Sequence, residues 1–337
     1  MDLTTTYLGM KLRNPFIAGA SPLTEQVDAV RELEDYGAAA VVLPSLYEER
    51  MRDKPIDRSN LERLYARAYA GSLTVGSGTP GRSPIEPLQY LERLAHIKRR
   101  VNIPVMASMS CTALGDWIEY SRLIADAGAD ALELNIYFVP DDPALTSADI
   151  EQRVVDIVTA VRQRVTIPIA VKISPFYTAL PHLIAEIARA GANGAVLFTR
   201  AYQPDIDVER RVVSPTLGLS HVSDQSELLL RLRWLAILSP WTTLSLALSG
   251  AVHTGLDAIK AIMSGAHAVQ VVSSLLNAGP AYMESLIEQF ELQMHRTRAT
   301  CLGELRGCLN HAASADPGAV ERAQYVTALH SWSTAAR

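Results

Sequence analysis

The chain has 337 residues, of which 48% are hydrophobic and 20% are charged, and its formal net charge at pH 7 is −5. This length and composition describe a globular protein, large enough for one large domain or two medium ones. The mild acidity argues against a nucleic-acid-binding surface, and no apolar run approaches the roughly 18 residues that a membrane helix needs.

The N-terminal segment shows no targeting signal. Residues 1–16, MDLTTTYLGMKLRNPF, lack a basic region followed by an apolar block, so a cytoplasmic location is expected. Within this segment, residues 3–12 could form a hairpin that plugs the N-terminal end of a larger fold. The three cysteines, Cys111, Cys301 and Cys308, have no close spacing, so neither a disulfide framework nor a metal site is expected.

Two kinds of segment alternate through the rest of the chain. One is a polar lead, Ile-Pro and an apolar strand, found in VNIPVMASMS (101–110) and VTIPIAVKIS (165–174), with a looser copy in WTTLSLALSG (241–250). The other is a glycine that ends a helix and is followed by a buried strand, found in YGAAAVVL (36–43), AGADALEL (127–134), AGANGAVL (190–197) and SGAHAVQV (264–271). The spacing fits one strand and one helix per unit.

Together with PFIAGAS (15–21), these segments predict eight strands. Amphipathic stretches such as DWIEYSRLIADAG and LPHLIAEIARAG lie between them, a pattern typical of a parallel sheet covered by helices. Eight such units predict an α/β fold of the (β/α)8 TIM-barrel class, in a single domain over residues 1–337. The strands are expected near residues 16–20, 39–43, 104–109, 131–135, 168–173, 194–199, 244–249 and 268–272.

Three segments are additional to the eight strand–helix units of a minimal barrel. Residues 45–90 form an excursion after the second strand, residues 200–232 form another after the sixth, and residues 290–337 form a helical, polar tail. Excursions that follow strands lie over the active-site mouth of a barrel, so the first two are candidate lids.

Small and polar residues end most of the predicted strands, where barrels place their active sites. Such residues suit a flat ligand that lies across the barrel mouth. Lys172 is the only Lys or Arg inside a predicted strand core, and it should face an anion or an electron-rich ligand, because burying it unpaired is costly. The strand-end residues are Gly19, Ala20, Ser21, Pro44, Ser45, Ser108, Ser110, Asn135, Lys172, Ser174, Thr199, Arg200, Ser249, Gly250, Ala251, Ser273 and Ser274.

The last two strand ends predict a phosphate site. In SGAVHTGLDAIKAI, a strand leads through Gly250 and Ala251 into a helix that begins near Thr254, and VVSSLLNAGP repeats this arrangement with Ser273 and Ser274. Backbone N–H groups at two helix N-termini can hold a phosphate group. Small residues at such turns also serve packing, and the sequence leaves both interpretations open.

Five segments, NPFIAGAS, ELNIYFVP, VKIS, VLFTRAYQPDID and SGAVHTGLDAIKAIMSGAHAVQVVSSLL, resemble in this order the dihydroorotate dehydrogenase family of FMN-dependent barrels, in particular its cytosolic branch. The resemblance implies FMN across the barrel mouth, with Asn135 and Lys172 against the isoalloxazine ring. Lys172 would stabilise negative charge on the reduced ring. The remaining cofactor-binding candidates are Gly19, Ala20 and Ser21 along the flavin, Gly250, Ala251, Ser273 and Ser274 at the phosphate, and Ser110, Thr199 and Arg200.

The resemblance fails at the catalytic base. The family carries Cys or Ser three residues after the Asn, to remove a proton from the substrate, and here Phe138 stands at that position. Phe cannot accept a proton. Tyr137 is a candidate, although a phenol with an ordinary pKa of about 10 is a poor base at neutral pH. Cys111, just past the third strand, could reach the site from a neighbouring loop, but a free Cys is more often a small core residue.

The substrate contacts depart from the family as well. The Asn side chains that bind orotate in the family are replaced by GSGTPGRSPIEP (76–87) and by Thr199, and Pro44 replaces a Lys near the flavin. Amide contacts to a pyrimidine are hard to replace with Ser or Thr. The sequence therefore indicates a retained flavin site and an altered orotate site.

Three further features allow two interpretations each. The segment GSGTPG (76–81) matches a dinucleotide fingerprint, but no helix opens after it, so a flexible lid is favoured. His253 could contact the phosphate or simply face solvent. Arg200 could bind an anionic substrate or the flavin phosphate, or it could pair with Asp205 or Asp207 and fix their loop.

The resemblance implies an FMN-dependent oxidoreductase that oxidises dihydroorotate to orotate, a step of pyrimidine biosynthesis, or acts on a related small molecule. The candidate catalytic residues are Lys172, Asn135 and Tyr137. The alternative is a flavin-binding barrel with another substrate or without turnover. By analogy with the family, a homodimer and a separate electron-transfer partner are possible, with exposed tail segments such as YVTALHSW available for dimerisation; neither nucleic acid nor a membrane span is expected.

Overall fold

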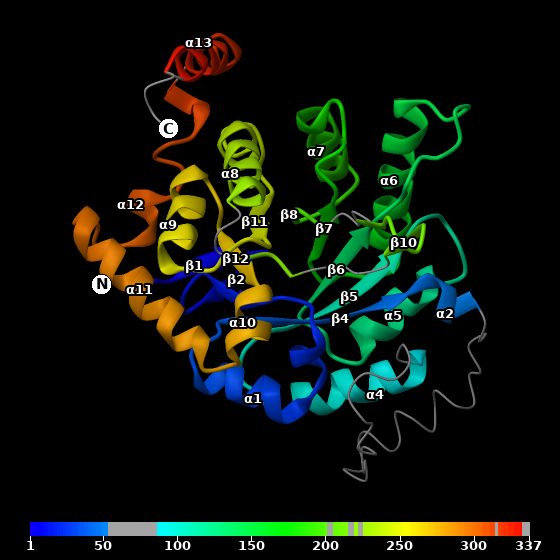
Figure 1. Ribbon diagram of the computed structural model, residues 1–337. Coiled ribbons are helices and arrows are strands. Elements are labelled where there is room, and N and C mark those ends of the chain that lie inside the picture. Colours follow the sequence, from blue (N-terminus) through cyan, green and yellow to red (C-terminus); the bar gives the residue numbers. More distant parts are fainter. Residues whose placement is uncertain (53–85, 201–204, 215–218, 222–224, 314–315, 332–337) are drawn as a thin grey trace.

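Eight parallel strands close into a barrel in the computed structural model, which describes residues 1–52, 86–200, 205–214, 219–221, 225–313 and 316–331 (Figure 1). Neighbouring strands follow the order β11-β12-β3-β4-β5-β6-β7-β8 around the barrel. The predicted (β/α)8 class is therefore confirmed, and each strand overlaps its predicted segment. The strands are β3 (Phe16–Ala18), β4 (Ala40–Tyr47), β5 (Val105–Cys111), β6 (Ala131–Ile136), β7 (Ile169–Ile173), β8 (Gly194–Leu197), β11 (Ser245–Ser249) and β12 (Ala268–Val271).

Helices ring the barrel on its outside (Figure 1). Each follows one strand and buries an apolar stripe against it, as α7 does with Leu180, Leu183, Ile184 and Ile187 at helical spacing. The helices that cover the barrel are α1 (Val27–Asp35), α4 (Pro87–Lys98), α5 (Ile118–Asp126), α6 (Ser147–Arg162), α7 (Leu180–Arg189), α8 (Ser226–Leu238), α9 (Gly255–Ser264) and α11 (Tyr282–Thr297). Shorter helices are α2 (Glu48–Arg52), α10 (Ser273–Ala278) and α12 (Leu302–Leu305), with 3-10 turns η1 (Pro22–Glu25) and η2 (His311–Ala313).

An N-terminal hairpin closes the bottom of the barrel. Its strands, β1 (Thr5–Tyr7) and β2 (Met10–Leu12), pair antiparallel. Tyr7, Leu8 and Leu12 are buried in the inner apolar cluster, together with strand residues that point into the barrel. The backbone N–H of Leu8 donates to Ser245 Oγ at 3.1 Å, which ties the hairpin to β11. The predicted plug is thus confirmed, and the opposite end of the barrel is left for the site.

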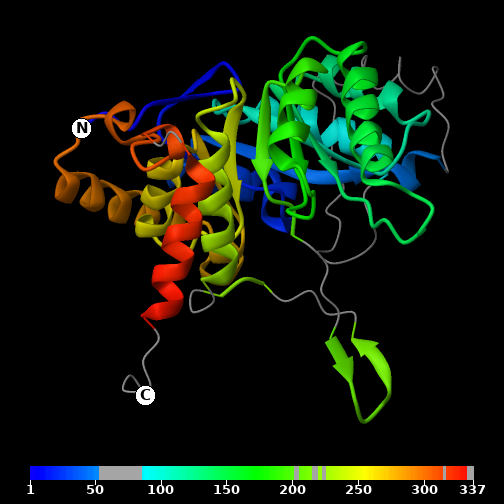
Figure 2. The same cartoon turned by 90° about the horizontal axis from the view of Figure 1, so that it is seen from above.

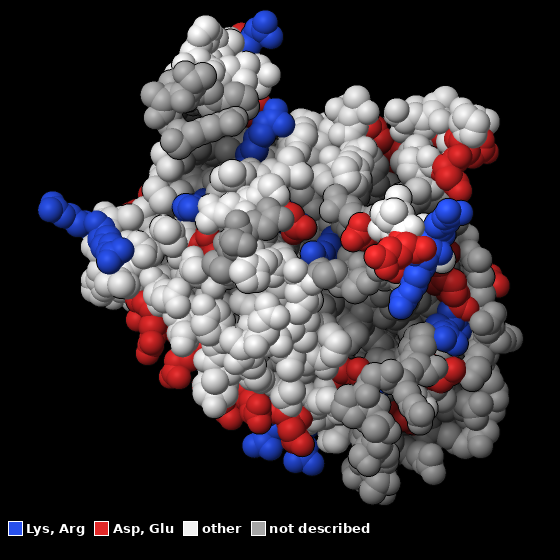
Figure 3. Space-filling view, in the orientation of Figure 1, with Lys and Arg blue, Asp and Glu red and all other residues white. Residues whose placement is uncertain are grey.

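The two excursions are described only in part. Residues 53–85, which hold most of the first excursion and the GSGTPG segment, lie outside the described residues. The second excursion contains a hairpin of β9 (Asp205–Asp207) and β10 (Val212–Ser214), which projects away from the barrel (Figure 2). On the face seen in Figure 3, basic and acidic side chains are interspersed rather than gathered by sign.

The C-terminal region begins later than residue 290. Helix α11 continues through that position to Thr297, and the Phe290 ring packs edge-on against Phe16 of β3 with a centroid distance of 5.4 Å. Beyond it lie α12 and α13 (Pro317–His330), which is nearly all exposed. In the part of the chain that the structure describes, no helix combines the length and apolarity that crossing a membrane demands.

Candidate active site

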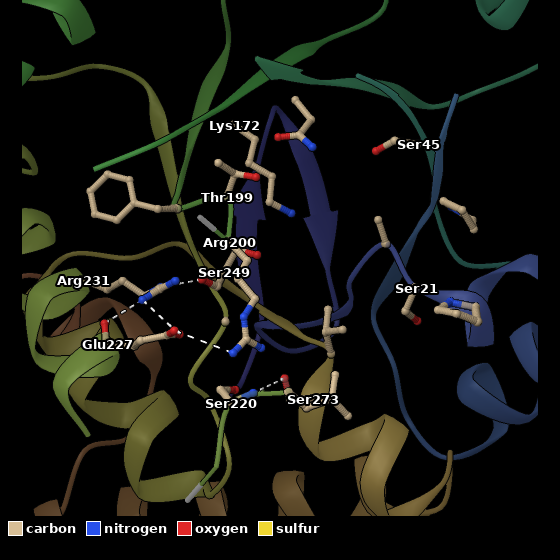
Figure 4. A pocket seen from close by; sticks show the side chains of 18 of the residues that line it. Ser21, Ser45, Lys172, Thr199, Arg200, Ser220, Glu227, Arg231, Ser249 and Ser273 are labelled. Carbon is tan, nitrogen blue, oxygen red and sulfur yellow. Dashed lines mark hydrogen bonds and ion pairs between the residues drawn. The ribbon is translucent and has the colours of Figure 1, made fainter. Parts of the chain in front are cut away.

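A cavity of about 420 Å³ opens at the C-terminal ends of the barrel strands. This is the end at which barrel enzymes carry their active sites. Its walls come from most of the strand ends, because the closed sheet brings them into one ring. The predicted residues that line it are Ala20, Ser21, Pro44, Ser45, Asn135, Lys172, Thr199, Arg200, Ser249, Gly250 and Ser273 (Figure 4).

Lys172 lies at the floor of this cavity and is held by a buried polar network. Its Nζ lies 3.3 Å from Glu133 Oε1 and 3.1 Å from Gln270 Oε1. Gln270 Nε2 in turn donates to Glu133 Oε2 at 2.5 Å. Glu133 and Gln270 are almost completely buried inside the barrel, so the network compensates the charge of Lys172 and fixes its position.

The anionic partner of Lys172 was missed in the sequence. Strand residues alternate between the barrel interior and the helices, so Glu133 faces inward with Asn135, while Leu132 and Leu134 join the outer cluster. Asn135 pairs in register with Lys172. The sequence did contain a signal, because Glu133 is a charged residue at an inward-facing position of a buried strand. Such a residue needs a partner of opposite charge inside the barrel.

Asn135 is less well satisfied than Lys172. Its Oδ1 is buried and has no hydrogen-bond partner among the described residues. An unpartnered buried acceptor is unfavourable in a folded protein. Asn135 lines the cavity, so this oxygen is available to a ligand that carries an N–H or O–H donor.

The opposite end of the cavity is built from two strand-to-helix turns. Gly250 and Ala251 both adopt left-handed backbone conformations, with φ of 84° and 59°. The turn leads into α9, whose N-cap Thr254 and Asp257 form a capping box. On the second turn, Ser273 lines the cavity, while Ser274 Oγ donates to the Val252 carbonyl at 3.1 Å and so joins the two turns.

The other predicted cofactor residues lie behind or beside the cavity wall. Ala251 is buried, and Gly19 packs so closely on Val272 that a Cβ there would lie 2.7 Å from its Cγ2. Ser110 lies between Tyr47 and Asn135 in the sheet register. These residues, with Ser274, support the wall rather than line it.

Three charged residues lie close together at the end of the cavity that the two strand-to-helix turns form, which we call the turn end (Figure 4). Arg200 Nη2 lies 3.9 Å from Glu227 Oε1, and Arg231 Nη1 lies 3.6 Å from Glu227 Oε2. Glu227 and Arg231 belong to α8 and were missed in the sequence. The signal was present: Arg231 occupies the apolar face of α8 between Leu228 and Leu235, where a buried cation needs a purpose.

For Arg200 and His253, one of the two interpretations of each is not found among the described residues, and phosphate binding stays a prediction for both. Arg200 pairs with Glu227, while Asp207 pairs with Arg210, so the expected Arg200–aspartate pair is not found among the described residues. His253 is buried rather than solvent-facing, and its Nε2 lies 3.1 Å from Ser220 Oγ. Burial lowers the pKa of His253, with the nearby charge of Asp257 acting in the opposite direction.

The aromatic pair after Asn135 turns away from the cavity. Tyr137 and Phe138 line a second cavity of about 270 Å³, between the ends of β6 and β7 and the first turn of α6. The Arg153 guanidinium lies 4.0 Å from the centroid of the Phe138 ring, a cation–π contact that holds the ring there. The structure therefore does not bring Tyr137 together with Lys172 and Asn135.

Cys111 is the last residue of β5 and belongs to the apolar core. Its side chain is fully buried, and burial raises the pKa of its thiol, with the Glu48 carboxylate adding to the effect. A buried, protonated thiol is a poor proton acceptor. The structure supports the interpretation of Cys111 as a core residue.

Comparison with known proteins identifies the family of the chain. Residues 2–294 match the sequence profile of the family described as dihydroorotate dehydrogenase. The chain is 26% identical over 306 residues to the dihydroorotate dehydrogenase B (NAD(+)) catalytic subunit of Thermoplasma acidophilum, covering 87% of this chain and 94% of that protein. It is 27% identical over 324 residues to the protein of the same name from Thermoplasma volcanium, covering 91% and 98%. A dihydroorotate dehydrogenase A (fumarate) of Lactobacillus delbrueckii subsp. bulgaricus is 26% identical over 205 residues, covering 60% of this chain and 65% of that protein.

Proposed function

The chain belongs to the dihydroorotate dehydrogenase family, and we propose that it is an FMN-dependent oxidoreductase that oxidises dihydroorotate or a related cyclic substrate. The observation that supports this most directly is the pairing of Lys172 and Asn135 in the sheet register at the floor of the cavity, where the Asn135 Oδ1 has no partner in the described part of the chain. A buried cation favours negative charge that develops on a ligand, and a free acceptor can bind a ligand N–H group, so the two suit a polar, electron-accepting ring.

Three parts of the cavity support the proposal of FMN as its ligand. Its floor offers Lys172 and the unpaired Asn135 oxygen to the polar edge of a ring. Its walls carry small residues, among them Ala20 and Thr199, that allow a flat group to lie close to the backbone. Its far end offers the backbone of Gly250 and Ser273 and two guanidinium groups to a phosphate.

The chain's own contribution to the chemistry is binding and electrostatics. Bound in this cavity, FMN would supply the acceptor for a hydride from the substrate. Lys172 holds a positive charge in a site of low solvent access, where it favours any state that carries additional negative charge. The Glu133–Gln270 network keeps Lys172 in place, so the charge is fixed before the substrate arrives.

The residue at the family's base position cannot accept a proton. Phe138 stands at the base position and is held by Arg153, outside the main cavity. The described cavity-lining residues carry two carboxylates, Glu25 and Glu227, and a set of hydroxyl groups that includes Tyr47 and Ser45, whose Oγ lies 2.8 Å from Ser108 Oγ. Glu25 forms an ion pair with Arg93.

A second candidate function follows from the same observation. Because Phe138 cannot accept a proton and faces the second cavity, a flavin-binding barrel with another substrate, or without turnover, remains the competing proposal. Two relatives named as NAD(+)-linked catalytic subunits favour a separate electron-transfer partner, and we propose such a partner and a homodimer as the assembly to look for.

Anaerobic mixing separates the two functions. FMN-loaded protein is mixed with dihydroorotate while the visible flavin absorbance is followed. Rapid bleaching supports dihydroorotate oxidation. A flavin that binds but stays oxidised with dihydroorotate excludes that substrate and favours the competing proposal, and failure to bind FMN contradicts both.

A further inference from the structure

The second cavity, which Tyr137 and Phe138 line, is rich in aromatic rings. Of the 11 described residues that line it, four are aromatic, and Phe176 and Tyr177 supply the other two rings. Aromatic residues make up only 6% of the whole chain, so the rings are concentrated at this cavity. The face of an aromatic ring carries partial negative charge and attracts cations.

The elements that carry these rings hold them in place. The Arg153 guanidinium lies over the Phe138 ring, which shows that a cation is stable on this ring. Tyr177 packs against the apolar core, and the Phe176 N–H donates to Ser174 Oγ at 3.3 Å at the end of β7. Phe176 nevertheless stays 72% exposed, so a large apolar side chain beside the cavity is available to a ligand.

Glu151 is the only charged residue among the described residues that line this cavity. Burial raises the pKa of the Tyr177 phenol to about 12, and the negative charge of Glu151 acts in the same direction. The carboxylate therefore lies near enough to the phenol for the two to interact, and the phenol stays protonated at neutral pH. The cavity thus combines aromatic walls with one negative charge.

The segment that forms this wall is acidic over a longer range. The charged residues between positions 137 and 153 are Asp141, Asp142, Asp149, Glu151 and Arg153. Four negative charges against one positive charge favour a cation at the cavity and disfavour an anion. Asp142 accepts from the Ala144 N–H at 2.9 Å and Asp149 from the Thr146 N–H at 2.8 Å, so these two carboxylates serve their own loop.

We propose that the second cavity binds a small organic ammonium ion, a quaternary or protonated amine whose carbon substituents contact the rings and whose charge faces Glu151. The volume of about 270 Å³ lies just below the roughly 300–1,000 Å³ of small-molecule sites, so the ligand is small. The hydroxyl groups of Ser147, Ser174 and Thr178 line the same cavity and can bind a polar group on the ligand. This inference does not depend on the proposed flavin function.

Two probes of the same shape test the proposal. Choline carries a trimethylammonium group, and 3,3-dimethyl-1-butanol carries a neutral tert-butyl group in its place. Calorimetric titration of the full-length protein, with and without FMN, gives a dissociation constant for each probe. Choline should bind at least about 10-fold more tightly than the alcohol, whether or not FMN is present. Equal affinity for the two probes, no binding of choline, or displacement of choline by FMN would overturn the proposal.

The variant Glu151→Gln locates the site. It should weaken choline binding about 5-fold or more and change binding of the alcohol less than about 2-fold, because only choline carries a charge. Phe176→Leu keeps an apolar side chain but removes a ring, and it should weaken choline binding about 3-fold or more. Glu288→Gln makes the same charge change at an exposed position of α11 and should leave both affinities unchanged. An unchanged choline affinity in Glu151→Gln, or an equal loss in Glu288→Gln, would overturn the proposal.

Discussion

Lys172 and Asn135 are neighbours in the sheet register, but the protein satisfies them differently. Lys172 has two partners inside the barrel, Glu133 and Gln270, whereas the Asn135 Oδ1 has none within the described ranges. The hydrogen bonds of Lys172 are complete within the chain, whereas the Asn135 Oδ1 is available to accept a hydrogen bond from a ligand. Their responses to substitution should therefore differ in sign.

Replacing Asn135 with leucine should stabilise the flavin-free protein. The substitution removes a buried acceptor without a partner, and the expected gain in unfolding free energy is about 1 kcal/mol. Asn193→Leu is the matched control, because Asn193 Oδ1 accepts from the Ile169 N–H at 2.9 Å and its loss should cost about 1 kcal/mol. Urea unfolding of both variants gives the comparison, and a loss of stability in Asn135→Leu would show that its oxygen is already satisfied.

Replacing Lys172 with methionine should destabilise the protein strongly. The change leaves the Glu133 carboxylate buried without its cation, and removing one partner of a buried ion pair costs about 3–5 kcal/mol. The double variant Lys172→Met, Glu133→Gln removes both charges and should recover much of the loss. Chemical unfolding of the two single variants and the double variant checks this; additive costs would mean that the two side chains do not interact.

At the scale of elements, the positions of the strands were predictable from the sequence, but the role of the charged residues of helix α8 was not. Apolar strands buried on both faces leave a continuous signal in the sequence, so β5, β6 and β7 lie where they were expected. Arg231 on α8 was missed because its role depends on where α8 meets β11, a contact between segments that no local pattern specifies. The aromatic pair at Tyr137 and Phe138 was found, but its direction depends on Arg153 of α6.

Close packing of α9 on α11 should make Gly255 intolerant of any side chain. A Cβ there would overlap the backbone of Gln289 and Phe290, which cannot move aside as a side chain can. Gly255→Ala should therefore cost about 2 kcal/mol or more and displace the start of α9 at the cavity. Gly303→Ala is the control, since its nearest neighbour would be Cys301 Sγ at 3.7 Å; it should be neutral or stabilise α12 by about 0.5 kcal/mol. Thermal unfolding compares the stabilities of the two variants. Equal midpoint temperatures would contradict the close packing of α9 on α11 at Gly255.

The turn between α9 and β12 should make stability depend on pH. Burial, with the charge of Arg306 acting in the same direction, lowers the pKa of His267 from 6.5 to about 4. The unfolded chain takes up a proton near pH 6.5 while the folded chain does not, so stability present above pH 6.5 is lost as the pH falls toward 4. The loss amounts to about 3 kcal/mol.

His267→Asn should remove that dependence. In the folded protein, His267 Nδ1 accepts from the Leu246 N–H at 3.1 Å, and the asparagine oxygen can take over this acceptor role without titrating. Urea unfolding at several pH values between 4 and 7 gives the test. A variant with the same pH slope as the wild-type protein would assign the acid sensitivity to other groups.

For the whole molecule, the barrel could be read from the repeat of strand and helix, because each unit covers its neighbours in the same way. The site could be read in part, since the closed ring brings the strand ends together and the sequence names most residues that line the cavity. Features that the sequence did not show include the inner partner Glu133, the α8 charges and the direction of Phe138. Each of these depends on a contact between elements, which the closed barrel sets and a linear pattern does not show.

The most direct test of a flavin in this cavity is a visible absorbance titration of flavin-free protein with FMN. The wild-type protein should bind one FMN per chain with a perturbed flavin spectrum. Lys172→Met should weaken binding or remove the perturbation, because Lys172 lies at the cavity floor, while Arg210→Gln should change neither. Absence of binding by the wild-type protein, or an unchanged spectrum and affinity in a folded Lys172→Met variant, would contradict the placement of a flavin across the barrel mouth.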